Sequence, residues 1–273
     1  MTPNSMSVLL PRFASSQPAP PPCIRHWWLG CFTWLVVQAG APLAAFGQHL
    51  EAVGAAVSLN VTQTQASPSV IDLGYYTLVT DADFSRYDEI GYRLAAYGRW
   101  QVGGSRFFVQ PELGYTASRG QRYAITYYPS STTALGPNEE GIVHRLRRGE
   151  LAMLAGLHTG RHTYLLVGPV LAVNQRQQAD PGYHLSELYN SLYQSVEPVN
   201  VLGQVGVGFV TGRFDFQLRY ERSLTPYSRR FTFEGKVHSY RQEIRQCLLT
   251  AGFLLHKSPQ PSAESPRDYR GTR

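Results

Sequence analysis

The chain has 273 residues, of which 43% are hydrophobic and 12% aromatic, and its formal net charge is +6. This length allows one large β domain or two small ones, and the 17 Tyr and 25 Gly favour strands and turns. The basic residues are spread along strand-like stretches, without a Lys/Arg tract, zinc-finger spacing or aromatic RNA-binding motif. The composition therefore argues against nucleic-acid binding.

Residues 1–47 are predicted to be a leader that ends in a secretory signal peptide. A basic pair precedes an apolar run from Trp27 to Val37, and Ala45 and Gly47 occupy the −3 and −1 positions of a cleavage site before Gln48. This order is typical of export signals, with an uncleaved anchor as the alternative.

The next region, 48–257, contains eight stretches in which residues alternate with the period of a strand, and none with a convincing helical period. In chain order they are 53–61, 92–100, 107–116, 149–158, 163–173, 199–210, 213–222 and 247–255. The fifth is apolar on both faces. The seventh, RFDFQLRYER, places Phe214, Phe216, Leu218 and Tyr220 on one face and charged or polar residues on the other.

The connections between these stretches alternate strictly between short and long. Short links such as QVGGS and TGR separate the long segments 62–90, 117–143, 174–198 and 223–240. Outer-membrane barrels have this arrangement, with short turns at the periplasmic rim and long loops outside. We therefore predict an all-β fold, an eight-stranded antiparallel up-and-down transmembrane β-barrel over 48–257, followed by a polar C-terminal tail, 258–273.

In such a barrel the charged face of each strand points into the lumen. A lipid-facing Arg near the midplane would cost about 2–4 kcal/mol, and an eight-stranded interior is barely wide enough for side chains. We expect a salt-bridged plug formed by Arg93, Arg99, Glu112, Glu150, Asp215, Arg219 and Glu221.

The opposite face carries aromatic residues near both ends of the strands. Two lipid-facing girdles are predicted: Trp100, Phe107, Phe209, Phe214 and Phe253 next to the short turns, and Tyr92, Tyr115 and Tyr220 next to the long loops.

The chain resembles the PorT-like outer-membrane β-barrel family and, more broadly, small barrels of the OmpA/OmpX type. The resemblance rests on the signal ending AFGQ, on YLLVGPVLAV, and on GQVGVGFVTGRFDFQLRYERSLT as a closing hairpin. It implies a surface barrel, and one relative is associated with protein secretion. Such barrels commonly end on an aromatic residue. Here a polar tail follows, so either Phe253 supplies that signal or insertion relies on something else.

Metal, cofactor and catalytic motifs are absent. His158 and His162 flank a turn without a carboxylate arranged beside them. His144, His184 and His238 lie near the outer rim or in loops, with acidic residues such as Asp81, Asp83, Asp88, Glu139 and Glu140 nearby in topology, but form no recognisable constellation. We expect no enzyme activity and no cofactor.

Basic residues gather at the expected outer rim, where guanidinium groups can pair with lipid A phosphates or simply form a solvated surface. They are Arg145, Arg147, Arg148, Arg229, Arg230, Lys236 and Arg241. The expected partners are outer-membrane lipid and lipopolysaccharide, and a surface protein or glycan bound by the long loops.

The leading hypothesis is thus a non-catalytic structural or interaction barrel in the outer membrane, associated with secretion or adhesion. Two alternatives stay open: a rim-located lipid-modifying enzyme, and a soluble periplasmic lipocalin-like barrel with the aromatics inside.

Overall fold

The computed structural model describes residues 49–74, 76–80, 90–103, 105–127, 138–179, 182 and 185–258. All of them belong to one compact unit, Phe46–Arg273. The predicted signal peptide lies outside the described residues, as does the predicted tail except for Ser258. No helix in the described ranges is long and apolar enough to cross a membrane.

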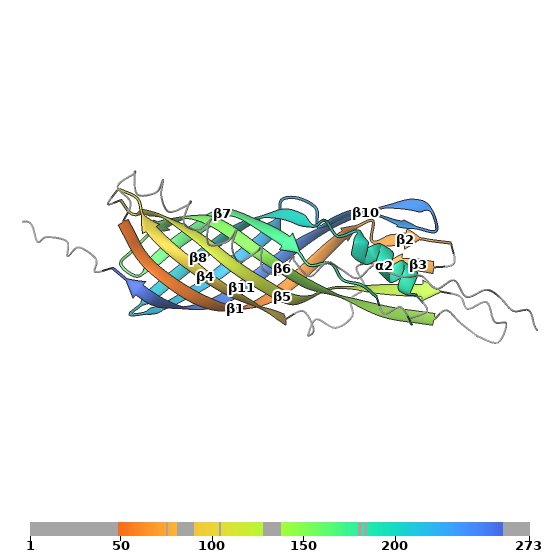
Figure 1. The fold of residues 1–273 in the computed structure, drawn as a ribbon, viewed down its shortest axis with the longest axis horizontal. Coiled ribbons are helices and arrows are strands. Elements are labelled where there is room, and N and C mark those ends of the chain that lie inside the picture. The colour runs from red at the N-terminus through yellow and green to blue at the C-terminus, as the bar shows by residue number, and fades with distance from the viewer. Residues whose placement is uncertain are drawn as a thin grey trace, which may run out of the picture. The chain divides into compact units, whose positions relative to one another are not determined.

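Eight antiparallel strands close into a ring (Figure 1). They are β1 (His49–Ser67), β4 (Ile90–Gln101), β5 (Phe107–Tyr127), β6 (Asn138–His158), β7 (Thr163–Asn174), β8 (Val199–Thr211), β9 (Phe214–Ser223) and β11 (Lys236–Lys257). Each pairs with the next in chain order, and β1 pairs with β11 to complete the ring. The predicted eight-stranded up-and-down barrel is confirmed.

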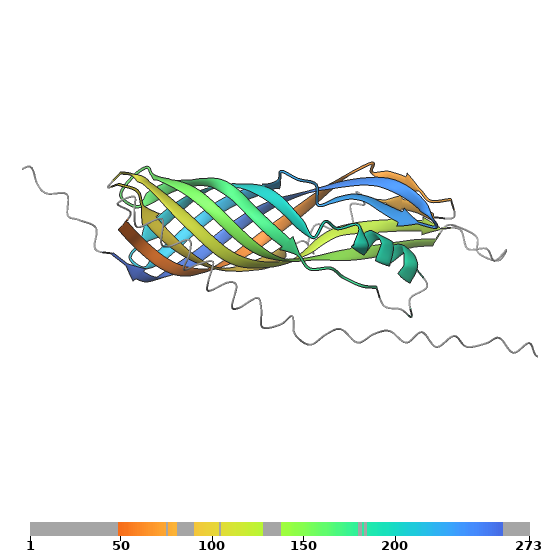
Figure 2. The same cartoon turned by 45° about the horizontal axis from the view of Figure 1, so that its top comes forward.

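Three tight turns lie at one end of the barrel, called here the short-turn end; the opposite end is the long-loop end (Figure 2). Gly103 and Gly212 have φ values of +55° and +58° in two of these turns. Glycine adopts this left-handed conformation at little cost, whereas residues with a side chain do so only with strain. Glycine at these two positions therefore allows the chain to reverse between adjacent strands.

The alternation along the strands places apolar side chains outside and polar ones inside. On β9, Phe214, Phe216, Leu218 and Tyr220 are all exposed, and the residues between them are buried. The other barrel strands follow the same pattern, so the exterior is apolar and the interior polar. This is the arrangement of a transmembrane barrel, because backbone polar groups are satisfied around the ring and lipid contacts only apolar side chains.

The soluble lipocalin-like alternative required the opposite orientation, and the structure overturns it. Leu218 is 56% exposed, whereas Arg219, the next residue, is 2% exposed. In water such an exterior would form a continuous apolar surface far larger than monomeric soluble proteins tolerate.

The long-loop end is more ordered than the sequence predicted. β5 and β6 remain paired beyond the barrel, as far as Tyr127 and Asn138, where a loop was expected over 117–143. Three further strands are present: β2 (Val70–Asp72), β3 (Tyr76–Val79) and β10 (Ser228–Phe233). Outside the lipid band a strand needs no apolar outer face, so the pattern that predicted the other strands is missing here.

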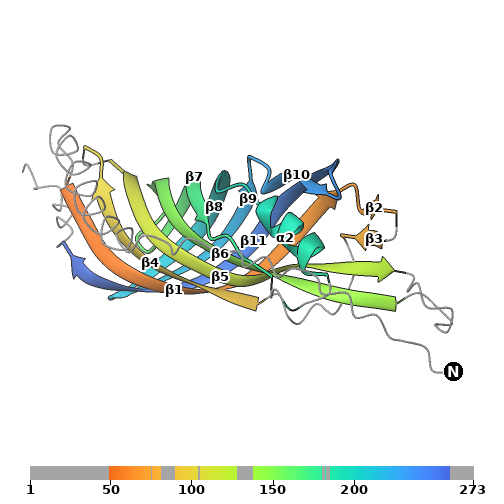
Figure 3. The same ribbon diagram turned by 45° about the vertical axis from the view of Figure 1, so that its right-hand side comes forward.

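A helix, α2 (Ser186–Gln194), also lies at the long-loop end, although the sequence predicted none (Figure 3). It buries only Leu188, Tyr189 and Leu192. Nine residues with three buried apolar positions give too short a pattern to stand out from loop sequence, and the helix depends on packing for its stability.

These elements form what we call the cap: β2, β3, α2, β10 and the adjoining ends of β1, β5 and β11. The cap has its own apolar core, made of Ala66, Ile71, Leu73, Leu78, Ile125, Leu185, Leu188, Tyr189, Leu192, Phe231, Phe233 and Tyr240. Edge-to-face ring contacts join Tyr76 to Phe233 and Phe231 to Tyr240. The described residues of the long-loop end therefore form a packed structure rather than a set of separate loops.

Candidate functional site: the barrel interior and the outer rim

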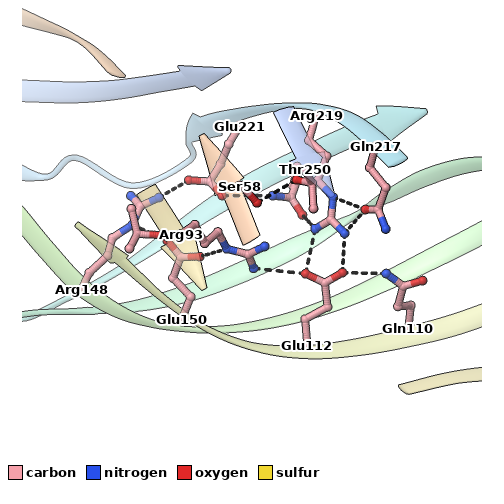
Figure 4. Close-up of polar contacts among 12 residues, drawn as sticks. Ser58, Arg93, Gln110, Glu112, Arg148, Glu150, Gln217, Arg219, Glu221 and Thr250 are labelled. Atoms are coloured by element: carbon pink, nitrogen blue, oxygen red, sulfur yellow. Dashed lines mark hydrogen bonds and ion pairs between the residues drawn. The ribbon is translucent and has the colours of Figure 1, made fainter. Parts of the chain in front are cut away.

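The centre of the barrel interior is a network of ion pairs between facing strands (Figure 4). Arg93 on β4 donates from Nε to Glu150 on β6 at 2.6 Å and from Nη2 to Glu112 on β5 at 3.1 Å. Glu150 also accepts a hydrogen bond from the Thr116 hydroxyl at 2.6 Å. These contacts join β4, β5 and β6, which are consecutive strands of the ring.

Glu112 accepts four hydrogen bonds from three residues of the network. Arg219, reaching from β9, donates from its Nη2 and Nη1 atoms to the two oxygens of Glu112 at 2.5 and 2.7 Å. Gln110 donates to the same carboxylate at 2.6 Å. The two parallel hydrogen bonds between Arg219 and Glu112 fix both the position and the plane of the guanidinium group. Such bidentate pairs are among the stronger ion pairs in proteins.

Arg148 corrects the sequence-based expectation, which placed it at the outer rim. Its side chain is fully buried and donates to Glu150 at 2.6 Å, to Glu221, and to Gln246 at 2.9 Å. The expectation began the strand at Gly149, whereas β6 begins at Asn138, so Arg148 shares the inward face with Glu150.

The interior near the short-turn end has a different composition, in which aromatic rings lie beside the ion pair of Arg99 with Asp215. Arg99 lies over the rings of Phe108 and Tyr164, at 4.7 and 4.3 Å from their centroids, and pairs with Asp215 at 3.0 Å. The hydroxyls of Tyr97 and Tyr164 also donate to Asp215. The sequence identified the charged pair but not the rings that enclose it.

The charges buried inside the described barrel balance. None of the eight is more than 2% exposed, and they comprise four arginines and four carboxylates: Arg93, Arg99, Arg148, Arg219, Glu112, Glu150, Asp215 and Glu221. All seven residues expected in the lumen lie there, and Arg148 is the eighth.

An apolar layer lies next to this network on the side of the cap. It consists of Leu146, Val196, Tyr227 and Ile244. Leu146 is two residues from Arg148 on the inner face of β6, and Val196 forms an isolated bridge with Ser228 at the start of β10. The connections that enter and leave the cap therefore pack into the mouth of the barrel.

The predicted girdle residues lie on the exterior. Seven of the eight are exposed by 41–59%, and Trp100 is partly buried. Phe214 and Phe253, on neighbouring strands, are in edge-to-face contact with ring centroids 5.8 Å apart. Aromatic side chains in these positions are typical of the two boundaries of a bilayer.

The basic residues expected to bind lipid phosphate do not form one site. Arg145 and Arg147 are exposed on β6, four strands around the ring from Lys236 and Arg241 on β11. The remaining two are exposed on β10, where Arg229 pairs with Glu197 at 3.5 Å. The order of the strands around the barrel therefore determines which of these basic side chains are close enough to bind the same phosphate.

The histidine positions do not assemble a catalytic or metal site among the described side chains. His158 contacts Glu51 at 3.2 Å, and His162 contacts the backbone oxygen of Val210 at 3.0 Å. His238 stacks on Phe231 in the cap. The described residues contain no group of three potential metal ligands. The side chains of His144, Glu139 and Glu140 lie outside the described part, as do His184, Asp81, Asp83 and Asp88.

Comparison with known proteins finds no matching family model and no matching curated sequence. Among solved structures, the chain is similar to the outer membrane protein Ail of Yersinia pestis, with 12% identity over 74% of this chain and 98% of that one and a TM-score of 0.34. Neisserial surface protein A gives 13% identity, coverages of 75% and 96%, and a TM-score of 0.35. The outer membrane protein OprG of Pseudomonas aeruginosa gives 8% identity over 76% of this chain and 98% of that one, with a TM-score of 0.36. The PorT-like resemblance stays a prediction, and the function below is argued from this chain's own residues.

Proposed function

We propose that this chain is an outer-membrane barrel with a non-catalytic role at the cell surface. The barrel anchors the cap in the membrane, and the cap binds a partner, either a surface protein or a glycan. An adhesive role and a role in secretion both fit this arrangement.

The balanced charge network inside the barrel is the observation that carries this proposal. Each of the eight buried charges is paired with an opposite charge inside a ring that is narrow in any eight-stranded barrel. A wide aqueous channel would leave such groups free to bind ions. The apolar layer beside the network further supports a closed interior.

The proposed location follows from the exterior and from the predicted export signal. Apolar side chains occupy the band between the two aromatic girdles, and only closed barrels and helices satisfy their backbone groups within lipid. Together with the predicted signal peptide, this supports export to the outer membrane, with lipid and lipopolysaccharide as its surroundings.

The cap supplies the surface for a partner. Its core includes fully buried residues such as Leu78, Ile125 and Tyr240, so its outer residues are held in fixed positions. A preorganised surface loses less conformational entropy on binding than mobile loops would.

We would test this proposal with two proteins displayed on Gram-negative cells. One is the intact chain; in the other, 68–80 and 176–195 are replaced by short Gly-Ser turns. Both must show the heat-dependent gel shift of a folded barrel. Binding of defined glycans and purified surface proteins to the intact chain alone is the expected result. Equal binding by the two proteins, or by neither, would contradict a role for the cap. A change in the mass of the host's outer-membrane lipids would favour the alternative enzyme.

A further inference from the structure

Three arginines and one carboxylate lie together on the exterior of the barrel. Arg222 on β9 and Arg241 on β11 each contact Glu243, at 3.2 and 3.1 Å. Arg245 lies directly opposite Arg222 in the pairing of β9 with β11. The sequence did not predict this cluster, because Arg222 and Arg245 meet only through the register of the two strands.

The charge of this cluster is not balanced by its own residues. The hydrogen bond donated by Arg222 lowers the pKa of the Glu243 carboxyl, so that this group is ionised at neutral pH, yet its one negative charge stands against the three positive charges of Arg222, Arg241 and Arg245. The Nε atom of Arg245 is buried and has no hydrogen-bond partner among the described residues. Like charges directly opposite each other on adjacent strands are destabilising, so this arrangement favours a bound anion.

The cluster lies just beyond the girdle at the long-loop end. Arg222 follows Tyr220 by two residues on the same outward face, and Arg245 precedes Cys247 in the same way. Successive residues on one face are separated by about 6–7 Å along a strand. The guanidinium groups therefore lie at the level where the headgroups of membrane lipids meet water.

An apolar groove of about 690 Å³ begins at the same place and runs along the barrel exterior. Tyr220 and Cys247 line it near the cluster, and Phe107 lines it near the short-turn end. Between them the groove is bordered by small outward-facing side chains of β7 and β8, namely Val167, Val205 and Val207. A hydrocarbon chain extending from the cluster would enter this groove directly.

We propose that these two features form one binding site for a membrane lipid with a phosphorylated headgroup. Arg222, Arg241 and Arg245 bind the phosphate, and an acyl chain occupies the groove along β7, β8 and β9. Planar guanidinium groups pair bidentately with phosphate oxygens, and the buried Nε of Arg245 gains a partner. The site depends on the membrane-spanning barrel and not on the partner of the cap.

A charge variant tests the phosphate-binding half of this site. Purified barrel is incubated with bisphosphorylated lipid A, with the same lipid after phosphate removal, and with inorganic phosphate, and retained ligand is counted by native mass spectrometry. We expect wild type to retain the bisphosphorylated lipid and R222Q/R245Q to bind it about tenfold more weakly, since several charge-assisted hydrogen bonds are lost. The matched control is R106Q/R161Q, which removes two exposed arginines at the short-turn end.

A second pair of variants tests the groove. Val205 and Val57 are both 50% exposed on the exterior, but only Val205 lines the groove. Val205→Trp is expected to weaken lipid retention, and Val57→Trp to leave it unchanged. Only variants that keep the heat-dependent gel shift are scored, so a folding failure is not mistaken for a binding defect.

Three results would overturn the proposal. Retention of lipid A by R222Q/R245Q at the wild-type level would show that the arginines do not bind it. Equal retention of phosphorylated and dephosphorylated lipid would show that the phosphate does not contribute to binding. Binding of inorganic phosphate as strong as that of the lipid would reduce the site to an anion site without a role for the groove.

Discussion

At the scale of single residues, Glu112 holds the interior network together. It accepts hydrogen bonds from Arg93, Arg219 and Gln110, and it is the only carboxylate that pairs with Arg219 among the described residues. Arg219 is also bonded to Gln204 and Gln217, but these amides carry no charge. The main energetic role of Glu112 is therefore to balance the charge of the buried Arg219 guanidinium.

Removing this carboxylate is expected to be costly. Glu112→Gln leaves Arg219 buried without a counter-charge, which lowers the free energy of unfolding by about 3–5 kcal/mol. The measurement is urea unfolding in detergent micelles, followed by the folded band on unboiled gels. E112Q/R219Q, which removes both charges, should be more stable than E112Q alone.

Glu243→Gln is the matched control, because Glu243 bridges two arginines on the exposed rim, where an ion pair contributes about 0–1 kcal/mol. Equal losses for E112Q and E243Q would show that the interior pairs are no more important than surface ones.

At the scale of the element, β7 illustrates how closely neighbouring strands approach in this barrel. Its Gly168 lies against β6, where a Cβ atom would come within 2.2 Å of the Met153 backbone oxygen and 2.9 Å of the Leu154 Cα. Both contacts are with backbone, so no side-chain movement can relieve them. The close approach of β6 and β7 thus requires glycine at this position.

Gly168→Ala is expected to lower the free energy of unfolding by about 1–3 kcal/mol, as other overpacking substitutions do. Gly149→Ala on β6 is the control, because a Cβ there would have no atom within 4 Å. Urea midpoints of the two variants should differ clearly. If G168A unfolds at the same urea concentration as G149A, the strands are not packed as described.

The cap has a core of its own, to which α2 contributes its buried side chains. A substitution in α2 can therefore change the stability of the cap without changing that of the barrel. Leu188→Ala removes a side chain that is 1% exposed from the cap core and should cost about 2–5 kcal/mol of local stability. Limited proteolysis should cleave the cap of L188A faster than that of wild type, while the gel shift of the barrel persists. Glu187→Ala, on the exposed side of α2, should be cleaved at the wild-type rate.

The elements that lipid surrounds could be predicted from the sequence, and those outside it could not. On β9 the alternation of charged and aromatic residues specifies both faces directly. On β7 both faces are apolar, and only the ring determines that Leu165 points outward and Leu166 inward. Arg148 was misplaced because the start of β6 has no lipid-facing pattern. The pair of Arg222 and Arg245 depends on a register that sequence spacing does not reveal.

At the scale of the whole molecule, the polar groups are concentrated inside the barrel and the apolar ones on its exterior and in the cap. The interior network, the apolar layer beside it and the cap core follow one another along the barrel towards the long-loop end. This order would give a membrane anchor with a preorganised surface, and it supports the proposed role of binding a partner at the cell surface.

Ion conductance across planar bilayers is the most direct test of whether the barrel interior is closed. Folded protein, verified by its heat-dependent gel shift, is reconstituted at increasing density, with a porin as the positive control. We expect no stepwise conductance, because the paired charges and the apolar layer lie inside a ring that is narrow in any eight-stranded barrel. Reproducible conductance steps from the folded protein would contradict a closed interior and would make a channel the leading interpretation.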